Sequence, residues 1–150
     1  MLKENETLTE LLDLPEGYTS RPPVMDDIPA AVELFNRCSL EMIGRKDNTE
    51  EGLRKDWSTP GLNHETDQRL VFSPGGKLVG YTEVWTVHGT PVYPFVWGRV
   101  HPEHEGLGIG SALLSWAEAR TRLVFERVPT GARVAFRCQA YGDYEPSNDL

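Results

Sequence analysis

Hydrophobic positions along the chain alternate between two periods, and the alternation predicts strands and helices in turn. After Asp26-Asp27-Ile28-Pro29, apolar residues recur every three or four positions, which is typical of a helix with one buried face. Asn48, with Glu51 three residues later, predicts the N-cap of a second, shorter helix, and residues up to Asp67 are then expected to form a loop. The buried stripe of the first helix is expected to contain Ile28, Ala31, Val32, Phe35, Cys38 and Met42.

Segments with β-branched and aromatic residues predict strands over 18–25, 68–73, 77–88 and 92–100. Pro22-Pro23 marks the first of these as an edge strand or an early stop. The turn residues at 74–76 and 89–91 predict consecutive hairpins, hence three antiparallel strands. Gly98 is expected to mark a bulge or a close approach of a ligand. Strict alternation along the second hairpin arm places Leu78, Gly80, Thr82 and Val84 on one face, and Val79, Tyr81, Glu83 and Trp85 on the other.

The stretch over 97–114 organises the chain. Pro102 ends the preceding strand because it cannot donate to a sheet ladder, and Gly106, Gly108 and Gly110 then allow a sharp turn and a close approach of the backbone to a ligand. A helix is expected to follow, to about residue 127. Its first N–H groups lack partners within the helix and lie at the positive end of its dipole. The sequence therefore predicts an anion site suited to a phosphate or pyrophosphate.

A fifth strand is predicted over 134–139, and because a helix links it to the fourth strand it is expected to run parallel to that strand. The last ten residues are polar. The predicted fold class is α/β (α+β), with a mixed, mostly antiparallel sheet flanked by helices.

Two familiar phosphate motifs do not fit the glycine stretch. A P-loop needs Lys and Ser/Thr after its glycines, but Ser111 and Ala112 follow Gly110. A dinucleotide fingerprint has the spacing G-x-G-x-x-G near the start of a βαβ unit, and here the spacing is G-x-G-x-G after several strands.

The stretch instead resembles the acetyl-CoA loop of the GNAT N-acetyltransferase superfamily, which reads Val-x-Pro, a short gap, Arg/Gln-x-x-Gly-x-Gly/Ala and a helix. Val100-His101-Pro102 and Gly108-Ile109-Gly110 match this pattern. Glu105 occupies the Arg/Gln position and brings a carboxylate next to the expected pyrophosphate, which opposes anion binding.

The resemblance implies an enzyme that transfers an acetyl group from acetyl-CoA to an amine of a small molecule, peptide or protein, without a metal. It implies that the backbone of Val100 donates to the thioester carbonyl. Glu83 is the candidate general base, and Tyr141 and Tyr144 follow the fifth strand near the thioester site expected in this superfamily. The implied coenzyme contacts are Arg99, Val100, Glu105, Gly106, Leu107, Gly108, Ile109, Gly110, Ser111 and Asn148.

The resemblance also implies a domain organisation. Residues 1–17 are expected to form an N-terminal extension, and residues 18–150 a GNAT-like domain that stops after its fifth strand, without the usual C-terminal helix and strand pair. The chain is therefore expected to be the amino-terminal part of a larger, two-domain acetyltransferase. Because an exposed strand edge leaves backbone groups unpaired, a second copy of the chain or a second GNAT domain is expected to cover it.

Composition narrows the partners. The 150 residues carry a net charge of −8, which argues against nucleic acid and against anionic membranes. The two cysteines, Cys38 and Cys138, have no metal-ligand spacing and are expected to be buried thiols. The N-terminus lacks the apolar run of a signal peptide, so a cytoplasmic location is expected.

Two alternative functions stay open. One is a non-catalytic GNAT-like domain with weak or no coenzyme binding and a structural or dimerisation role. The other is a nucleotide-binding regulatory domain.

Overall fold

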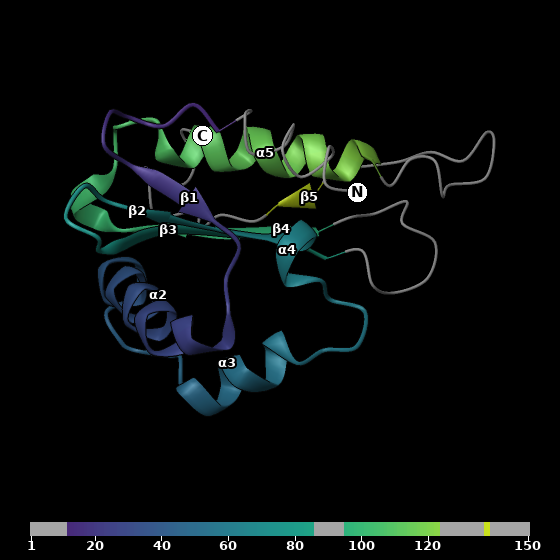
Figure 1. Cartoon of the computed structure of the whole chain (residues 1–150). Coiled ribbons are helices and arrows are strands. Elements are labelled where there is room, and N and C mark those ends of the chain that lie inside the picture. The colour runs from purple at the N-terminus through teal and green to yellow at the C-terminus, as the bar shows by residue number, and fades with distance from the viewer. Residues whose placement is uncertain (1–11, 86–94, 124–136, 139–150) are drawn as a thin grey trace.

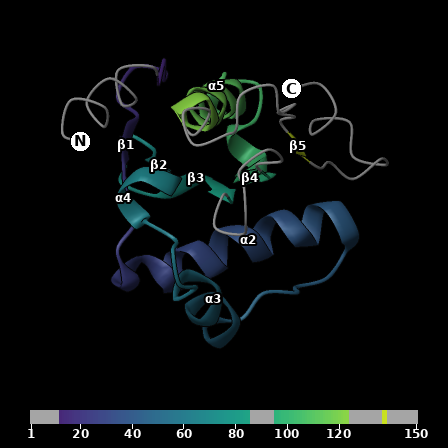
Figure 2. The ribbon, with the colours of Figure 1, turned by 90° about the vertical axis from the view of Figure 1, so that its right-hand side faces the viewer.

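In the computed structural model, the described residues are 12–85, 95–123 and 137–138. They form a five-stranded sheet in the order β1-β2-β3-β4-β5, with helices α2 and α3 on one face and helix α5 on the other (Figures 1 and 2). The first four strands pair antiparallel, and β5 pairs parallel with β4. The predicted fold class is confirmed. The strands are β1 (Thr19–Arg21), β2 (Gln68–Phe72), β3 (Leu78–Trp85), β4 (Phe95–Val100) and β5 (Arg137–Cys138); the helices are η1 (Met25–Asp27), α2 (Ile28–Ile43), α3 (Glu50–Trp57), α4 (His64–Asp67), η2 (Pro102–His104) and α5 (Ile109–Leu123).

Helix α2 follows the predicted pattern. Pro29 lies in its first turn, where a missing N–H costs no hydrogen bond, and Gly44 ends it with φ +74°, a left-handed conformation that favours glycine. Its buried stripe packs on the sheet together with Trp57 of α3. This core cluster consists of Ile28, Ala31, Leu34, Phe35, Cys38, Trp57, Leu70, Leu78 and Tyr81.

The core on the other face of the sheet lies under α5. Ile109 and Leu113 pack on Val71 and Val79, and one turn further along the helix Trp116 and Ala117 pack on Val84 and Val96. Burial of these two apolar layers against a single sheet is the main source of stability in such an architecture.

The cap of α3 differs from the prediction. Thr49, not Asn48, is the N-cap, and its Oγ1 accepts a hydrogen bond from the backbone N–H of Gly52. Asn48 instead exchanges hydrogen bonds with Asn36 of α2, at 2.9 Å and 3.0 Å, and so fixes the α2–α3 connection to α2. Both of these bonds are made by the backbone of Asn48, and its side chain donates to Asp47 Oδ1 at 2.7 Å. Contacts outside α3 therefore occupy the residue that local spacing assigned to the cap.

Three further sequence expectations are corrected. The segment expected to be a loop contains α4, and Gly98 is not at a bulge, since β3 and β4 keep a regular register over their whole pairing. A Cβ at Gly98 would lie 2.8 Å from the carbonyl oxygen of Tyr81, so the close approach is to the neighbouring strand. The irregularity lies instead between β2 and β3, where Val71 pairs with Gly80 and Phe72 with Leu78. The extra residue, Val79, moves Leu78 to the α2 face and itself faces α5, opposite to the predicted alternation.

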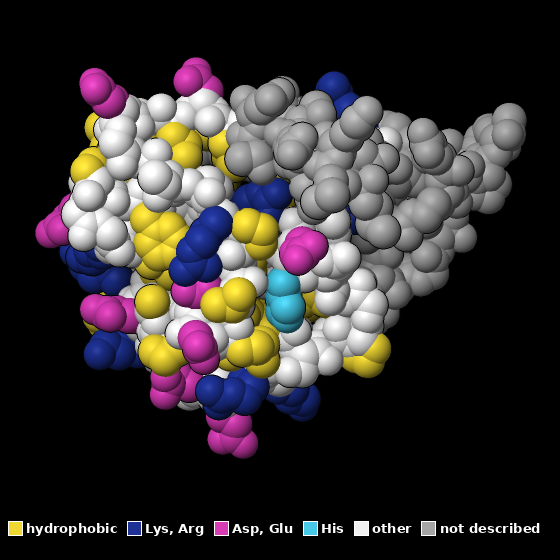
Figure 3. Space-filling view, in the orientation of Figure 1, with side chains coloured by type: hydrophobic (Ala, Val, Ile, Leu, Met, Phe, Trp, Pro, Cys, Tyr) yellow, Lys and Arg dark blue, Asp and Glu magenta, His cyan; other side chains and the backbone are white. Residues whose placement is uncertain are grey.

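Acidic and basic side chains are interspersed over the described part of the face shown in Figure 3. Within the described ranges, no helix combines the length and apolar character needed to cross a lipid bilayer.

Candidate active site

The glycine loop has the backbone geometry that its sequence predicts. Gly106 and Gly108 have φ of +78° and +87°, and a Cβ added at either position would meet nothing within 4 Å. Helix α5 begins at Ile109, and the carbonyl oxygen of Gly108 accepts the hydrogen bond from Ala112 N at 3.0 Å. The loop therefore reaches the positive end of the helix with open space beside its backbone.

Short contacts hold the turn before this loop. The buried His101 donates its backbone N–H to the carbonyl of Val79 at 2.8 Å, and its Nδ1 accepts from the N–H of Glu103 at 3.1 Å. Burial, the largest influence, lowers the pKa of His101, which keeps Nδ1 available as an acceptor. His104 Nδ1 and the hydroxyl of Tyr18 lie 2.8 Å apart. The turn is thus tied to β3 and to the segment leading into β1.

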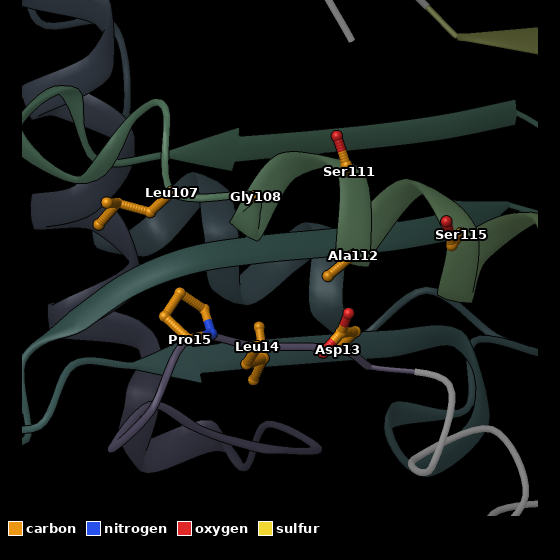
Figure 4. Close-up of a pocket in the computed structure, with 8 residues that line it drawn as sticks. All are labelled: Asp13, Leu14, Pro15, Leu107, Gly108, Ser111, Ala112 and Ser115. Carbon is orange, nitrogen blue, oxygen red and sulfur yellow. The ribbon is translucent and has the colours of Figure 1, made fainter.

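A hollow of about 390 Å³ adjoins the loop on the side of the chain segment that leads into β1 (Figure 4). Leu107 and Gly108 form one end, and Asp13, Leu14 and Pro15 face α5 across it. Ala112 points toward this segment, whereas Ser111 points away from it. The tip of the loop therefore borders solvent, and Leu107 is 48% exposed.

Strand β4 offers backbone groups along the edge that faces β5. The described pairing with β5 comprises Phe95 with Arg137 and Val96 with Cys138. Because His101 N bonds to Val79 O, the antiparallel ladder directs the N–H and C=O groups of Val100 and Gly98 away from β3. These are the two residues of β4 nearest the glycine loop whose amides point to that edge.

Both of these carbonyl oxygens have side-chain donors. Arg99 Nη1 donates to Gly98 O at 2.8 Å, and the thiol of Cys38 in α2 donates to Val100 O at 3.3 Å. Burial raises the pKa of Cys38 to about 11, so the thiol keeps its proton near neutral pH. The prediction that Cys38 is a buried thiol is confirmed, and the structure gives it a partner on the strand that borders the loop.

Aromatic rings cover the α2 face of the same strands. The ring of Tyr81 stacks on Trp57 at 5.9 Å and meets Phe35 at 5.0 Å, and Phe35 meets Trp97 edge-on at 4.8 Å. We refer to Phe35, Trp57, Tyr81 and Trp97 as the aromatic cluster. Arg99 lies on the same face, with its Cζ 4.2 Å from the centroid of the Trp97 ring.

Glu83 ends a directed chain of hydrogen bonds beside this cluster. Gln68 Nε2 donates to the hydroxyl of Tyr81 at 2.7 Å, and that hydroxyl donates to Glu83 Oε2 at 2.7 Å. His64 Nδ1 contacts Gln68 Oε1; because Oε1 is an acceptor only, Nδ1 is the donor. Every donor in the chain points toward Glu83, which therefore receives the hydrogen bond as a carboxylate does.

The surroundings of Glu83 act on its charge in opposite directions. Burial, the largest influence, raises the pKa of Glu83, and the nearby Asp56 adds to this. Hydrogen bonds from Trp85 and Tyr81 and the charge of Arg99 lower the pKa. A carboxylate with a raised pKa that still accepts hydrogen bonds has the properties of a general base.

The structure brings together several of the residues singled out in the sequence. Val100, the glycine loop and the start of α5 adjoin one another, and Glu83 lies one strand away on the α2 face. The side chain of Arg99 lies on that face as well, beside Trp97, and not on the face that α5 covers. Tyr141, Tyr144 and Asn148 lie outside the described residues.

Sequence reasoning missed the roles of Gln68 and His64. Alternation placed Tyr81 and Glu83 on one face, but only the pairing of Leu70 with Tyr81 and of Gln68 with Glu83 brings β2 into the cluster. No local pattern encodes that pairing.

The sequence profile of the acetyltransferase (GNAT) family matches residues 28–132. The chain belongs to this family. The match includes α2, the sheet from β2 to β4, the glycine loop and α5. No curated protein matches the chain in sequence.

Solved structures show the same fold. The crystal structure of a GCN5-related N-acetyltransferase from Sphaerobacter thermophilus is 27% identical over 91% of this chain and 42% of its own, with a TM-score of 0.83. A GNAT superfamily phosphinothricin acetyltransferase from Sinorhizobium meliloti, in complex with acetyl-CoA, is 22% identical over 71% of this chain and 60% of its own, with a TM-score of 0.58. An acetyltransferase-like protein of Salmonella typhimurium, solved with its cofactor acetyl-CoA, is 21% identical over 73% of this chain and 66% of its own, with a TM-score of 0.56. The chain thus spans less than two thirds of the length of each of these proteins.

Proposed function

We propose that the protein is an N-acetyltransferase that binds acetyl-CoA at the glycine loop and transfers the acetyl group to an amine. The observation that carries this proposal is the pair of left-handed glycines, Gly106 and Gly108, which lead into the N-terminus of α5 next to the outward-facing amides of β4. Membership of the GNAT family and the two neighbours solved with acetyl-CoA support the choice of coenzyme.

In this proposal the loop from Glu105 to Ser111 holds the pyrophosphate through backbone N–H groups. Such groups bind phosphate without a cationic side chain, because several N–H dipoles converge on the oxygens. The acyl arm runs along β4, where the amide of Val100 donates to the thioester carbonyl as negative charge develops on it. The thiol of Cys38 donates to the carbonyl oxygen of Val100. Val100 therefore offers its N–H group, as a donor, at the strand edge.

Glu83 acts as the general base. The acceptor arrives as an ammonium ion, whose pKa is ordinarily about 10.4, and must lose a proton before it can attack. The raised pKa of Glu83 suits this transfer, and the hydrogen bonds from Tyr81 and Trp85 hold its carboxylate in place. Tyr141 and Tyr144 are proposed to protonate the departing thiolate, and Asn148 to contact the coenzyme.

Calorimetric titration with acetyl-CoA tests the coenzyme site. The native chain is expected to bind with a stoichiometry of about one, and Gly108→Val to abolish binding, because a β-branched residue is strained at φ +87° and its side chain fills the space beside the loop. Gly44→Val is the matched control: Gly44 has φ +74° and equally open surroundings, but it ends α2. If both variants bind equally well, the loop is not the coenzyme site.

A further inference from the structure

The hydroxyl of Tyr81 has one proton to donate, and the structure directs it to Glu83. The oxygen of this hydroxyl accepts from Gln68 Nε2 at 2.7 Å, and its proton goes to Glu83 Oε2 at 2.7 Å. Tyr81 and Gln68 are fully buried, so water does not replace either of them as a partner. Because a hydrogen bond is stronger when its acceptor is ionised, this one favours the carboxylate form of Glu83.

The orientation of the Gln68 amide decides where that proton points. An amide presents a donor, Nε2, on one side and an acceptor, Oε1, on the other. Were the amide turned over, Oε1 would lie against the hydroxyl of Tyr81 and would compete with Glu83 for its proton. Strand pairing across β2 and β3 fixes the position of Gln68 opposite Glu83, but it does not fix which end of the amide faces Tyr81.

His64 selects between the two orientations of this amide. Its Nδ1 contacts Gln68 Oε1, and a ring nitrogen that carries a hydrogen there can bond only to the oxygen of the amide. The ring of His64 is held in turn, because its centroid lies 5.9 Å from that of Trp57. The residue also occupies the first position of α4, whose N-cap is Asn63. The side chain farthest from Glu83 therefore sets the direction of the whole chain of hydrogen bonds.

We propose that Gln68 and His64 are positioning residues of the reaction: they hold the Tyr81 proton on Glu83, which keeps Glu83 ionised and ready to accept a proton from the amine. Their role in catalysis rests on the proposed function, in which Glu83 is the base. Asp56 of α3 and Arg99 of β4 also act on the charge of Glu83, in opposite directions. Both stay in place in every variant used to test the proposal.

Four substitutions separate this role from a merely structural one. Gln68→Met keeps an unbranched side chain but removes the donor to Tyr81. His64→Leu removes the donor to Gln68, whereas His64→Asn keeps an N–H group near the position of Nδ1. Thr82→Val is the matched control, because it removes another buried hydroxyl of β3, one that donates to the carbonyl oxygen of Trp97.

The first measurement is the titration of the Glu83 carboxyl, followed by carbon NMR of isotope-labelled glutamate in the full chain. The signal is assigned by its loss in Glu83→Gln. Because the carboxylate loses support, the midpoint is expected to move to higher pH in Gln68→Met, and less far in His64→Leu. His64→Asn and Thr82→Val are expected to keep the native midpoint.

This titration does not depend on activity, so it decides the inference by itself. A midpoint that stays in place in both Gln68→Met and His64→Leu overturns it, and so does a midpoint that Thr82→Val moves equally far. If Gln68→Met does not fold, His64→Leu against His64→Asn decides, because His64 is only half-buried.

The second measurement is the pH profile of kcat/KM for acetyl transfer. The acidic limb is expected to move with the NMR midpoint, and kcat/KM at neutral pH to fall by roughly three- to tenfold in Gln68→Met, the effect of one net hydrogen bond. If the midpoint moves and the limb does not, Glu83 is not the base, and the role of Gln68 and His64 in the reaction is overturned. Calorimetry with acetyl-CoA distinguishes the remaining case: a native chain that neither binds the coenzyme nor transfers acetyl groups overturns the proposed function, and the midpoints still decide whether this chain of hydrogen bonds keeps Glu83 ionised.

Discussion

The hydroxyl of Tyr81 donates a hydrogen bond to Oε2 of Glu83 at 2.7 Å, although both side chains come from the same strand and only one residue separates them. Tyr81 is fully buried and Glu83 is half-buried, so the strand carries its candidate base next to a donor that water does not replace. This relationship leads to two predictions, one on activity and one on stability.

Tyr81→Phe is expected to lower kcat/KM at neutral pH by about tenfold and to move its acidic limb to higher pH. The substitution keeps the ring in the aromatic cluster but removes a donor to a charged group, which is worth roughly 1.5–3 kcal/mol. Because that donor lowers the pKa of Glu83, its loss raises the pKa further, and less of the base is ionised at a given pH. The measurement is the pH profile of kcat/KM, taken at acceptor concentrations well below KM.

Tyr18→Phe is the control for this variant. It removes another phenol hydroxyl, one that contacts His104 and not Glu83, and it should leave the acidic limb in place. An unchanged limb in Tyr81→Phe would contradict the assignment of Glu83 as the base.

Glu83→Gln is expected to abolish acetyl transfer but to stabilise the fold at neutral pH. Since burial raises the pKa of Glu83, the folded state binds this proton more tightly than the unfolded state does, and stability falls as pH rises from the unfolded pKa, ordinarily 4.5, through the folded value. A neutral amide avoids this loss. Thermal unfolding at pH 7 and at pH 4 checks the prediction: the gain should be present at pH 7 and should shrink at pH 4. A gain of equal size at both values would rule out ionisation as its cause.

Glu105→Arg is expected to increase affinity for acetyl-CoA by up to about tenfold. It removes an anion and adds a cation next to the proposed pyrophosphate, and surface charge pairs contribute roughly 1 kcal/mol or less. Calorimetry at low and high salt is the measurement, because screening should reduce the gain. Glu103→Arg makes the same change of charge in η2; if it gives the same gain, the effect belongs to the net charge of −8 and not to this position.

Arg120→Met is expected to destabilise the protein by about 3–5 kcal/mol, because it leaves a buried carboxylate without its partner. Arg120 Nη2 lies 2.9 Å from Asp67 Oδ1, with side-chain exposures of 14% and 3%, and Arg120 Nε donates to the carbonyl of Thr66. Urea unfolding measures the loss. Arg122→Met is the control: its pair with Glu118 is exposed on both sides and should contribute less than about 1 kcal/mol. Similar losses in the two variants would contradict this account of the Asp67–Arg120 pair.

Local chemistry in the sequence was sufficient to predict α2, the strands that form the sheet and the glycine loop. Pro29 and Gly44 mark the ends of α2, and the loop glycines Gly106 and Gly108 adopt left-handed backbone conformations that favour glycine. Such features are encoded within a few residues, so the family could be identified from them, and the family match confirms it.

Tertiary structure decided what these elements place together. The α4 helix holds Asp67 against Arg120, which lies 53 residues away along the chain, and Thr49 caps α3 because α2 binds Asn48. Val79 is an extra residue in β3, between the residues that pair with Val71 and Phe72 of β2. It places Leu78 and Val79 on the faces opposite to those that strict alternation predicts. The register of the strands brings Gln68 within hydrogen-bonding distance of the Tyr81 hydroxyl and makes Arg99 a diagonal neighbour of Glu83. Periodicity reports which side of an element is apolar, but the partner of each side chain depends on contacts between strands and helices distant in sequence, and those contacts form only when the whole sheet packs.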